Sequence, residues 1–268
     1  MEYIYRKSLL YKSKVEYADF CINHIEGCSH GCKFPCFALV MSKRTGRRKT
    51  YEDWCKPKIV KNALELLEKE IPKYKDKIKA VEICFMSDPF MYKNLEVEEM
   101  TLKIINRLNS NGIKCIVLTK GIYPKELIDT KKYSDKNKYG ITLVSLNDDF
   151  KKQFEPNSSP YNDRINSLRV LHDAGLKTWV SIEPYLTPNM FEQNLMEILE
   201  RISFVDYIVF GKLNYNPKVK EYPNNQQFYE DMANLVEDFC KKRNIKFHIK
   251  EGTKRVYDRS TAAILSDN

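Results

Sequence analysis

The sequence contains 268 residues, and its 45 Lys and Arg exceed its 36 Asp and Glu to give a formal net charge of +9. Apolar residues make up 43% and charged residues 30%, a balance typical of a folded domain, which excludes a disordered chain. No apolar run approaches the ~18 residues of a membrane span, and the N-terminal stretch lacks the apolar core of a signal peptide, so we expect a cytoplasmic protein.

Short β-rich runs alternate along the chain with segments of helical periodicity. Strands are predicted at Val15–Ile25, Lys79–Phe85, Lys114–Thr119, Tyr139–Leu146, Lys177–Ile182, Val205–Phe210 and Lys246–Ile249. Helices are predicted at Pro57–Tyr74, Val97–Leu108, Pro124–Tyr133, Tyr161–Ala174, Met190–Ile202 and Gln226–Arg243. This alternation indicates a parallel sheet with helices packed outside it.

The number of alternating units favours a barrel over an open doubly wound sheet. We predict an α/β fold, a partial (β/α)6-type TIM barrel with parallel strands, in a single domain that spans residues 1–268. The core is expected over residues 15–250, followed by a polar C-terminal tail. In folds of this kind the active site lies at the C-terminal ends of the strands.

Three of the eight cysteines, Cys28, Cys32 and Cys36, lie in one short segment, GCSHGCKFPCFA. Spacings of four residues would place the thiols on one helical stripe, but Gly31 and Pro35 both oppose a helix. A loop can instead turn the three sulfurs toward one centre, where a metal binds them as thiolates. We therefore predict a metal or cluster site. Disulfides are not expected, because a chain of this length without a secretion signal does not need them.

Two kinds of site fit these cysteines. Zinc would need a fourth ligand, which His30 can supply within the same segment. Three cysteines can also hold an iron–sulfur cluster with one iron left open, and an open iron at a barrel mouth is reactive. The spacing favours the cluster. The alternative is a non-catalytic zinc-binding module with a basic surface that binds nucleic acid.

The cysteine segment resembles the cluster loop of the radical S-adenosylmethionine (radical SAM) superfamily, which follows the first strand of a β/α chain. The usual loop has three residues and then two between its cysteines, whereas this loop has three and three, with Pro35 as the extra residue. Further segments resemble the spore photoproduct lyase-like branch: Met86-Ser87-Asp88-Pro89-Phe90, Leu118-Thr119-Lys120, and Glu155-Pro156 followed by Arg164 and Leu168.

The resemblance implies that Cys28, Cys32 and Cys36 bind a 4Fe–4S cluster whose open iron chelates S-adenosylmethionine. Reductive cleavage of S-adenosylmethionine would then leave methionine and a 5′-deoxyadenosyl radical, which abstracts hydrogen from a substrate. It also implies an enzyme of the lyase or transferase type that takes electrons from a separate donor.

Position at a strand end, combined with charge, suggests contacts to S-adenosylmethionine. Ser87 and Asp88 are expected to accept from its ammonium group, and Lys120 to pair with its carboxylate. The other candidates are Ser145 for the ribose hydroxyls, Arg164 for the carboxylate or for pairing with Glu155, and Glu183 for ribose or substrate. For each position the competing interpretation is an ordinary turn, solvated or ion-paired residue.

A basic segment, Ser42–Tyr51, follows the cysteine segment directly. We expect a flexible loop whose cations hold phosphates near the site, with Tyr51 or Trp54 stacking a base. The lyase-like resemblance implies a nucleic-acid substrate, while a peptide or a small molecule stays open. The competing interpretation is a solvated lysine-rich surface.

Overall fold

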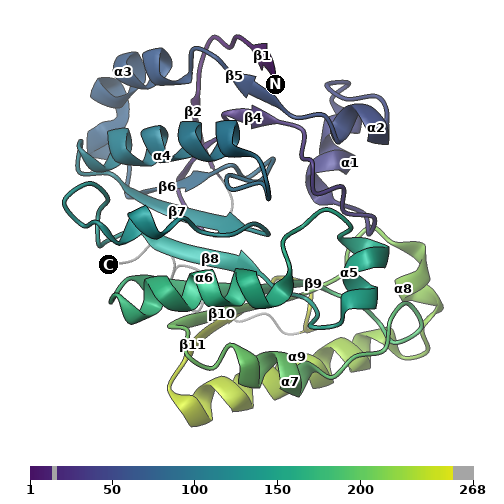
Figure 1. The fold of residues 1–268 in the computed structure, drawn as a ribbon. Coiled ribbons are helices and arrows are strands. Elements are labelled where there is room, and N and C mark those ends of the chain that lie inside the picture. Colours follow the sequence, from purple (N-terminus) through teal and green to yellow (C-terminus); the bar gives the residue numbers. More distant parts are fainter. Residues whose placement is uncertain (14–16, 256–268) are drawn as a thin grey trace.

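The computed structural model describes residues 1–13 and 17–255, and its main sheet has eight strands. In spatial order they are β11 (Lys246–Ile249), β10 (Tyr207–Lys212), β9 (Lys177–Tyr185), β8 (Lys138–Thr142), β7 (Lys114–Thr119), β6 (Ala80–Ile83), β3 (Phe20–Ile22) and β2 (Leu10–Lys12). All neighbours pair in parallel except β2, which runs antiparallel to β3 at one edge. The arrowheads of the parallel strands therefore point to one side of the molecule (Figure 1).

The sheet is a partial barrel. The seven predicted strands correspond to β3, β6, β7, β8, β9, β10 and β11, which pair in parallel, so the sheet has one parallel strand more than a (β/α)6 unit. The edge strands β2 and β11 do not pair with each other in the described residues, so the barrel stays open. The predicted partial (β/α)6 fold is confirmed.

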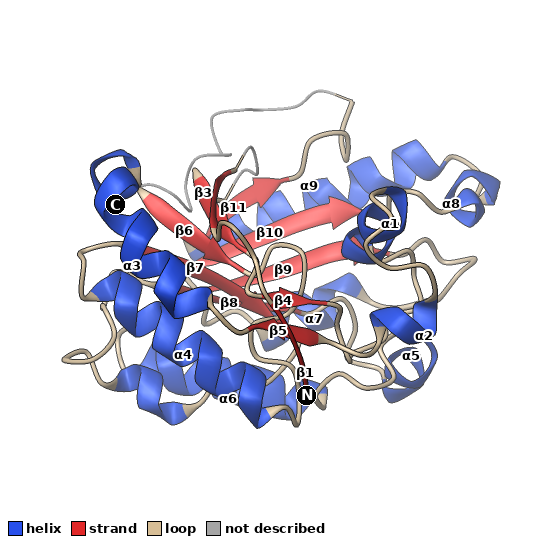
Figure 2. Cartoon of the chain, turned by 90° about the horizontal axis from the view of Figure 1, so that it is seen from above, coloured by secondary structure: helices blue, strands red, loops and turns tan. Residues whose placement is uncertain are grey.

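Amphipathic helices cover the outer face of the sheet. Helix α4 (Leu95–Asn109) begins where the Asn94 side chain accepts from the backbone N–H of Val97, and it turns Ile104 and Ile105 into the core. Figure 2 shows α3, α4 and α6 together on one side of the strands. The longer helices are α3 (Ala63–Tyr74), α4, α6 (Tyr161–Asp173) and α9 (Asn225–Arg243), and the shorter α7 (Leu195–Arg201) packs against α9.

Short elements gather where the parallel strands end. These are α1 (Phe37–Arg44), α2 (Tyr51–Trp54), α5 (Asp148–Phe154) and α8 (Pro217–Glu221), which lie beside the arrowheads in Figure 1. A second sheet of three strands, β1 (Glu2–Ile4), β5 (Lys58–Val60) and β4 (Ile25–Glu26), lies next to them. Short 3-10 helices occur at Lys75–Lys77 and Lys125–Ile128.

Several predicted boundaries are wrong. The predicted helix from Pro57 is strand β5 followed by α3, because Lys58–Val60 pairs with both β1 and β4. The predicted helix Met190–Ile202 shortens to α7, whose start is set by the Asn194 side chain accepting from the backbone N–H of Met196. Only the 3-10 helix occurs within Pro124–Tyr133.

Other differences concern the ends of the chain. The predicted first strand reduces to β3 with the separate β4, and its residues 15 and 16 lie outside the described residues. Most of the predicted polar tail also lies outside them. No helix in residues 1–13 and 17–255 is long and apolar enough to span a membrane.

The lumen of the barrel is closed at its floor by a small apolar cluster that includes Tyr17, Ala80, Trp179 and Val209. Gly140 lies opposite Trp179 in the β8–β9 register, and a Cβ at position 140 would be 2.2 Å from the Trp179 ring. The absence of a side chain at position 140 therefore lets the indole fill the lumen. A cavity lies above this floor, at the C-terminal ends of the strands.

Candidate active site

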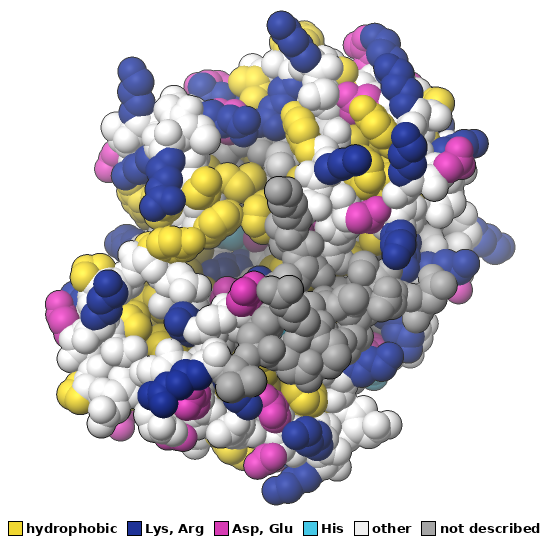
Figure 3. Space-filling view, turned by 180° about the vertical axis from the view of Figure 1, so that it is seen from behind, with side chains coloured by type: hydrophobic (Ala, Val, Ile, Leu, Met, Phe, Trp, Pro, Cys, Tyr) yellow, Lys and Arg dark blue, Asp and Glu magenta, His cyan; other side chains and the backbone are white. Residues whose placement is uncertain are grey.

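The three clustered cysteines open onto one cavity of about 520 Å³. Cys28, Cys32 and Cys36 form one wall, on the loop between β4 and α1, and residues at the ends of the parallel strands form the rest. Figure 3 shows the hollow from behind, with hydrophobic side chains at its rim and lysine and arginine side chains around it. The prediction that the active site lies at this end of the barrel agrees with this placement.

Distant parts of the chain hold the cysteine loop in shape. The backbone N–H of Cys28 donates to the Trp54 carbonyl at 2.9 Å, and that of Lys33 donates to the Phe154 carbonyl at 2.8 Å. Gly31 has φ +59°, and its carbonyl accepts from the Tyr51 hydroxyl at 2.6 Å. Helix begins only at Phe37, so the segment is a loop, as Gly31 and Pro35 predict.

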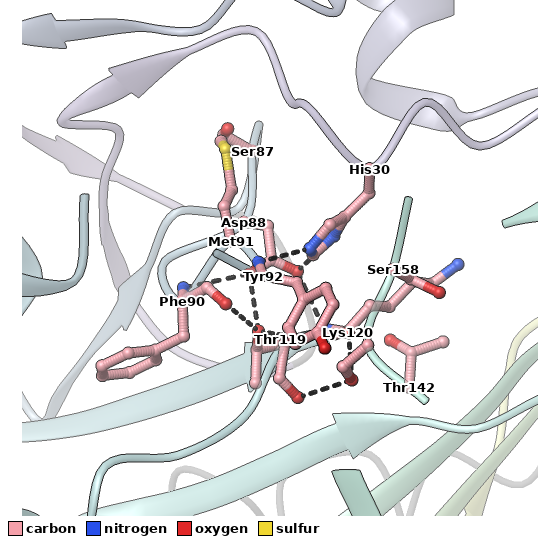
Figure 4. Close-up of polar contacts among 12 residues, drawn as sticks. His30, Ser87, Asp88, Phe90, Met91, Tyr92, Thr119, Lys120, Thr142 and Ser158 are labelled. Carbon is pink, nitrogen blue, oxygen red and sulfur yellow. Dashed lines mark hydrogen bonds and ion pairs between the residues drawn. The ribbon is translucent and has the colours of Figure 1, made fainter. Parts of the chain in front are cut away.

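His30 is part of this support and has no nitrogen to spare for a metal. Its Nε2 accepts from the backbone N–H of Tyr92 at 2.9 Å, and its Nδ1 lies 3.4 Å from an oxygen of Asp88 (Figure 4). A neutral imidazole with one nitrogen accepting carries its proton on the other, which here faces the carboxylate. The fourth ligand that zinc would need is therefore already engaged.

The placement of the other possible metal ligands in the described residues also argues against a single zinc ion. Within residues 1–13 and 17–255, no three His, Cys, Asp or Glu side chains converge closely enough to hold a single metal ion. A structural zinc needs four ligands around one ion. Three cysteines that hold a cluster bind separate irons, so their sulfurs need not converge on one point. The arrangement fits a cluster better than a single ion.

Asp88 is buried and fully hydrogen-bonded. One oxygen accepts from the Thr119 hydroxyl at 2.6 Å and from the backbone N–H of Phe90, while the other accepts from the backbone N–H of Lys120 at 2.8 Å (Figure 4). Although burial opposes its charge, His30 and these hydrogen bonds keep the pKa of Asp88 below its ordinary value. Asp88 lines the cavity, but its contacts join the ends of β6 and β7 to the cysteine loop.

Lys120 places a positive charge directly beside the cysteine loop. Its Nζ lies 2.7 Å from Glu155 and 3.6 Å from the sulfur of Cys32, above the Phe34 ring at 4.4 Å from the centroid. Burial opposes this charge, but the sulfur of Cys32 and the carboxylate of Glu155 outweigh it and raise the pKa of Lys120. The predicted strand-end lysine therefore borders the cavity as a fixed cation.

Arg164 and Ser145 lie behind the cavity wall, so the structure does not support direct contact with a bound cofactor for either. Arg164 has no exposed surface; it pairs with Glu155 at 3.4 Å and donates to the Thr142 carbonyl at 2.6 Å. Ser145 is also buried, and its hydroxyl accepts from the backbone N–H of Asn147. Arg164 instead holds Glu155 in place, which is the second of the two roles predicted for it.

Ser87, which follows β6, and Glu183, on β9, both line the cavity. Ser87 donates to the carbonyl of Gly27 just before the first cysteine, which joins the end of β6 to the loop. Glu183, on β9, lies 3.7 Å from the Nζ of Lys250. A Cβ at Gly211 would come within 3.0 Å of both side chains, so a side chain at position 211 would force Glu183 or Lys250 to shift.

The sequence interpretation missed polar residues that border the same cavity. These are Thr119, Thr142, Ser181, Lys212, Asn214 and Lys250. Thr119, Thr142 and Lys212 are the last residues of β7, β8 and β10. Position at a strand end was the signal that could have found these three.

Comparison with known proteins identifies the family. The family model of the radical SAM superfamily matches residues 22–202. The chain belongs to the radical SAM superfamily. As a radical SAM protein it uses a 4Fe–4S cluster and S-adenosylmethionine as cofactors.

Two curated relatives and two solved structures resemble this radical SAM chain. Uncharacterized protein MJ0683 of Methanocaldococcus jannaschii is 26% identical over 83% of this chain and 82% of its own length. Uncharacterized protein ORF301 of Acidianus two-tailed virus is 25% identical over 75% and 71%. Spore photoproduct lyase complexed with dinucleoside spore photoproduct matches with a TM-score of 0.65 and 15% identity, over 91% of this chain and 80% of that one. A variant of it with bound AdoMet matches equally well.

Burial controls two of the thiols of this radical SAM site. It raises the pKa of Cys28 well above its ordinary value and that of Cys32 to about 12, the latter against the attraction of Lys120. These two thiols therefore keep their protons until a metal replaces them, so loading the site releases protons.

The basic segment 42–51 differs from the predicted flexible loop. Residues Ser42–Arg44 belong to α1, and Arg48 is only 1% exposed because it pairs with Glu26 and Asp53. Tyr51 is hydrogen-bonded to the cysteine loop and Trp54 is buried, so neither ring is free to stack a base. The exposed cations of this segment are Lys43, Arg44, Arg47 and Lys49.

Proposed function

We propose that the chain cleaves S-adenosylmethionine reductively at a cluster held by Cys28, Cys32 and Cys36, and abstracts hydrogen from a nucleic-acid substrate. One observation carries this proposal. The three thiols open onto a single cavity at the C-terminal ends of parallel strands, which also contains the charged groups of Lys120 and Glu183. A cavity of about 520 Å³ has room for a cofactor with part of a substrate beside it.

The donor set fits the cluster. Three cysteines leave one iron open for S-adenosylmethionine, and the ammonium of Lys120 offsets the negative charge that thiolate ligands bring. When bound, the cluster supplies the electron that converts S-adenosylmethionine into methionine and a 5′-deoxyadenosyl radical.

The side chains of the cavity wall position the reactants and exclude water. We propose that Ser87 accepts from the cofactor ammonium and that Glu183 binds ribose or substrate in the same cavity. Lys120 faces the cofactor carboxylate from its place beside Cys32. The rings of Phe34, Phe37, Trp54 and Phe85 border the same space and shield a radical from solvent.

Two observations support nucleic acid as the substrate class. The net charge of +9 favours a polyanionic partner. Spore photoproduct lyase, whose fold this chain shares, has been solved with a dinucleoside spore photoproduct.

Anaerobic reconstitution followed by reduction with dithionite tests the first half of the proposal. We expect a brown protein that releases 5′-deoxyadenosine from S-adenosylmethionine, whereas Cys36→Ala abolishes both colour and release. Cys55→Ala is the matched control, because Cys55 lies next to the loop but does not line the cavity. A colourless protein that holds one zinc would overturn the proposal in favour of a zinc module.

A further inference from the structure

An exposed aromatic ring lies at the mouth of the cavity, and two cations that have no carboxylate partner among the described residues lie near it. The end of β10 supplies Lys212, the segment after it supplies Asn214 and Tyr215, and α1 supplies Phe37 and Arg44; all except Arg44 line the cavity. Tyr215 is 61% exposed and Phe37 is 41% exposed, although most aromatic rings of the described chain are buried. Apolar rings left in water at a cavity mouth mark a surface that contacts a ligand.

The backbone at Tyr215 supports a functional role for its ring. Tyr215 has φ +61°, a left-handed conformation that a bulky residue adopts only at a cost of about 1 kcal/mol or more. The strain does not bury the ring, because the side chain remains exposed. It holds the ring over the cavity mouth, where the guanidinium of Arg44 lies 5.8 Å from the ring centroid.

The charges around this ring favour an anion. Neither Arg44 nor Lys212 has a carboxylate within 4.0 Å among residues 1–13 and 17–255, whereas Lys120 and Lys250 are each paired with a glutamate. Exposed Lys218 and Lys220 on α8 add to the positive charge nearby. An aromatic ring flanked by unpaired cations has the chemistry of a site for a base with its adjacent phosphates.

We propose that Tyr215 and Phe37 stack an unpaired base, while Arg44 and Lys212 hold the flanking phosphates. The ligand is a single-stranded or locally unpaired nucleic-acid segment, because a base inside a duplex cannot reach a ring at a cavity mouth without leaving its stack. This inference rests on the proposed function and adds to it the substrate form and the residues that hold it.

The test uses the reconstituted holoprotein with S-adenosylmethionine and no reductant. Fluorescence anisotropy measures binding of a labelled thymidine dodecamer and of the same sequence as a duplex. We expect the single strand to bind more tightly, and Tyr215→Ala to weaken it about 5- to 150-fold while Tyr215→Phe binds normally. Arg44→Gln and Lys212→Gln should each reduce the salt slope of log K by about 0.7, whereas Lys103→Gln on the outer helix α4 leaves it unchanged.

The outcomes separate this inference from the proposed function. Release of 5′-deoxyadenosine by dithionite needs no oligonucleotide, so it reports on the cofactor site alone. If that release occurs but Tyr215→Ala binds the dodecamer as the wild type does, or the duplex binds as tightly as the single strand, the base-stacking site is overturned. If release fails while the binding pattern holds, the base site stands and the proposed catalysis does not.

Discussion

At the scale of single residues, Lys120 links the cluster site to the buried core. It contacts the sulfur of Cys32 on one side and the carboxylate of Glu155 on the other, and Arg164 holds Glu155 from behind. These contacts hold the ammonium in place beside the cysteine loop. A fixed cation beside a thiolate ligand stabilises the form of a cluster that carries one more electron.

Lys120→Met should therefore lower the midpoint potential of the reconstituted cluster, on the order of 50–100 mV for ~1–2 kcal/mol of lost attraction. A redox titration followed by electron paramagnetic resonance, without S-adenosylmethionine, measures it. Lys120→Arg keeps the charge and should stay near the wild-type potential. An unchanged potential in a fully loaded methionine variant would contradict this role.

Glu82 is a buried ionisable residue that has no role in the proposed site. Its side chain is 4% exposed on β6, and its Oε2 has no hydrogen-bond partner among the described residues. Burial raises the pKa of Glu82 to about 8, against the attraction of Lys250. As the pH rises from 4.5 to 8, the unfolded chain loses this proton before the folded chain does. The free energy of unfolding therefore falls across that window.

Glu82→Gln removes this titration. We expect the variant to match the wild type near pH 4.5 and to exceed its stability at pH 8.5, with a gap that grows by up to about 1.4 kcal/mol per pH unit. Urea unfolding of the reconstituted proteins at several pH values measures the gap. Glu65→Gln, on the exposed face of α3, should track the wild type throughout. A gap that shrinks with rising pH would rule out the buried protonated acid.

Residue-level predictions from the sequence succeeded where a local rule applies. The cysteine loop was visible because Gly31 and Pro35 exclude a helix, and Lys120 because it follows a strand end. The pairing of Arg164 with Glu155 was one of the predicted alternatives, but the burial of Arg48 was not visible, because it depends on Glu26 meeting it from another part of the chain. A charged residue in sequence does not reveal whether its partner is water or a carboxylate.

At the scale of elements, the β8–β9 pair illustrates how strictly the lumen is packed. Gly140→Ala would force its methyl into the Trp179 ring, which neighbouring strands hold in place. We expect a loss of about 1–3 kcal/mol in the free energy of unfolding, measured by urea denaturation. The double variant with Trp179→Leu should recover part of that loss. If the double variant loses as much stability as the two single variants together, the two residues do not share this space.

The alternation of strands and outer helices along the chain could be predicted from periodicity, because each unit buries its own apolar stripe. The short elements could not be predicted in this way. Helix α5 is seven residues long and mostly polar, and α2 has four residues, so neither shows a helical repeat. Strand β1 pairs with β5, more than fifty residues away, through three residues each. Such pairing depends on the folded barrel, so local pattern does not reveal it.

At the scale of the whole molecule, the cluster site joins the N-terminal segment to the barrel. Cluster binding stabilises the folded chain alone, because the unfolded chain has no such site. We expect loading to raise the thermal midpoint by ~5–10 °C, from ~2.7 kcal/mol or more of binding free energy. Chelation of iron should reverse the gain, as differential scanning calorimetry can show.

Cys36→Ala should show no gain, whereas Cys55→Ala should gain as the wild type does. If the loaded and stripped wild-type proteins melt together, the loop is not coupled to the fold as the structure indicates.

The support of the cysteine loop also bears on how the protein is made. The carbonyl of His30 accepts from the backbone N–H of Asn157, and the carbonyl of Ser29 accepts from the side-chain amide of Asn157. During synthesis from the N-terminus, the three cysteines leave the ribosome well before these partners exist. The loop can take its final shape only once the chain has been translated beyond residue 157. The cellular machinery that delivers iron and sulfur therefore does not meet the finished loop in a nascent chain that ends before Asn157.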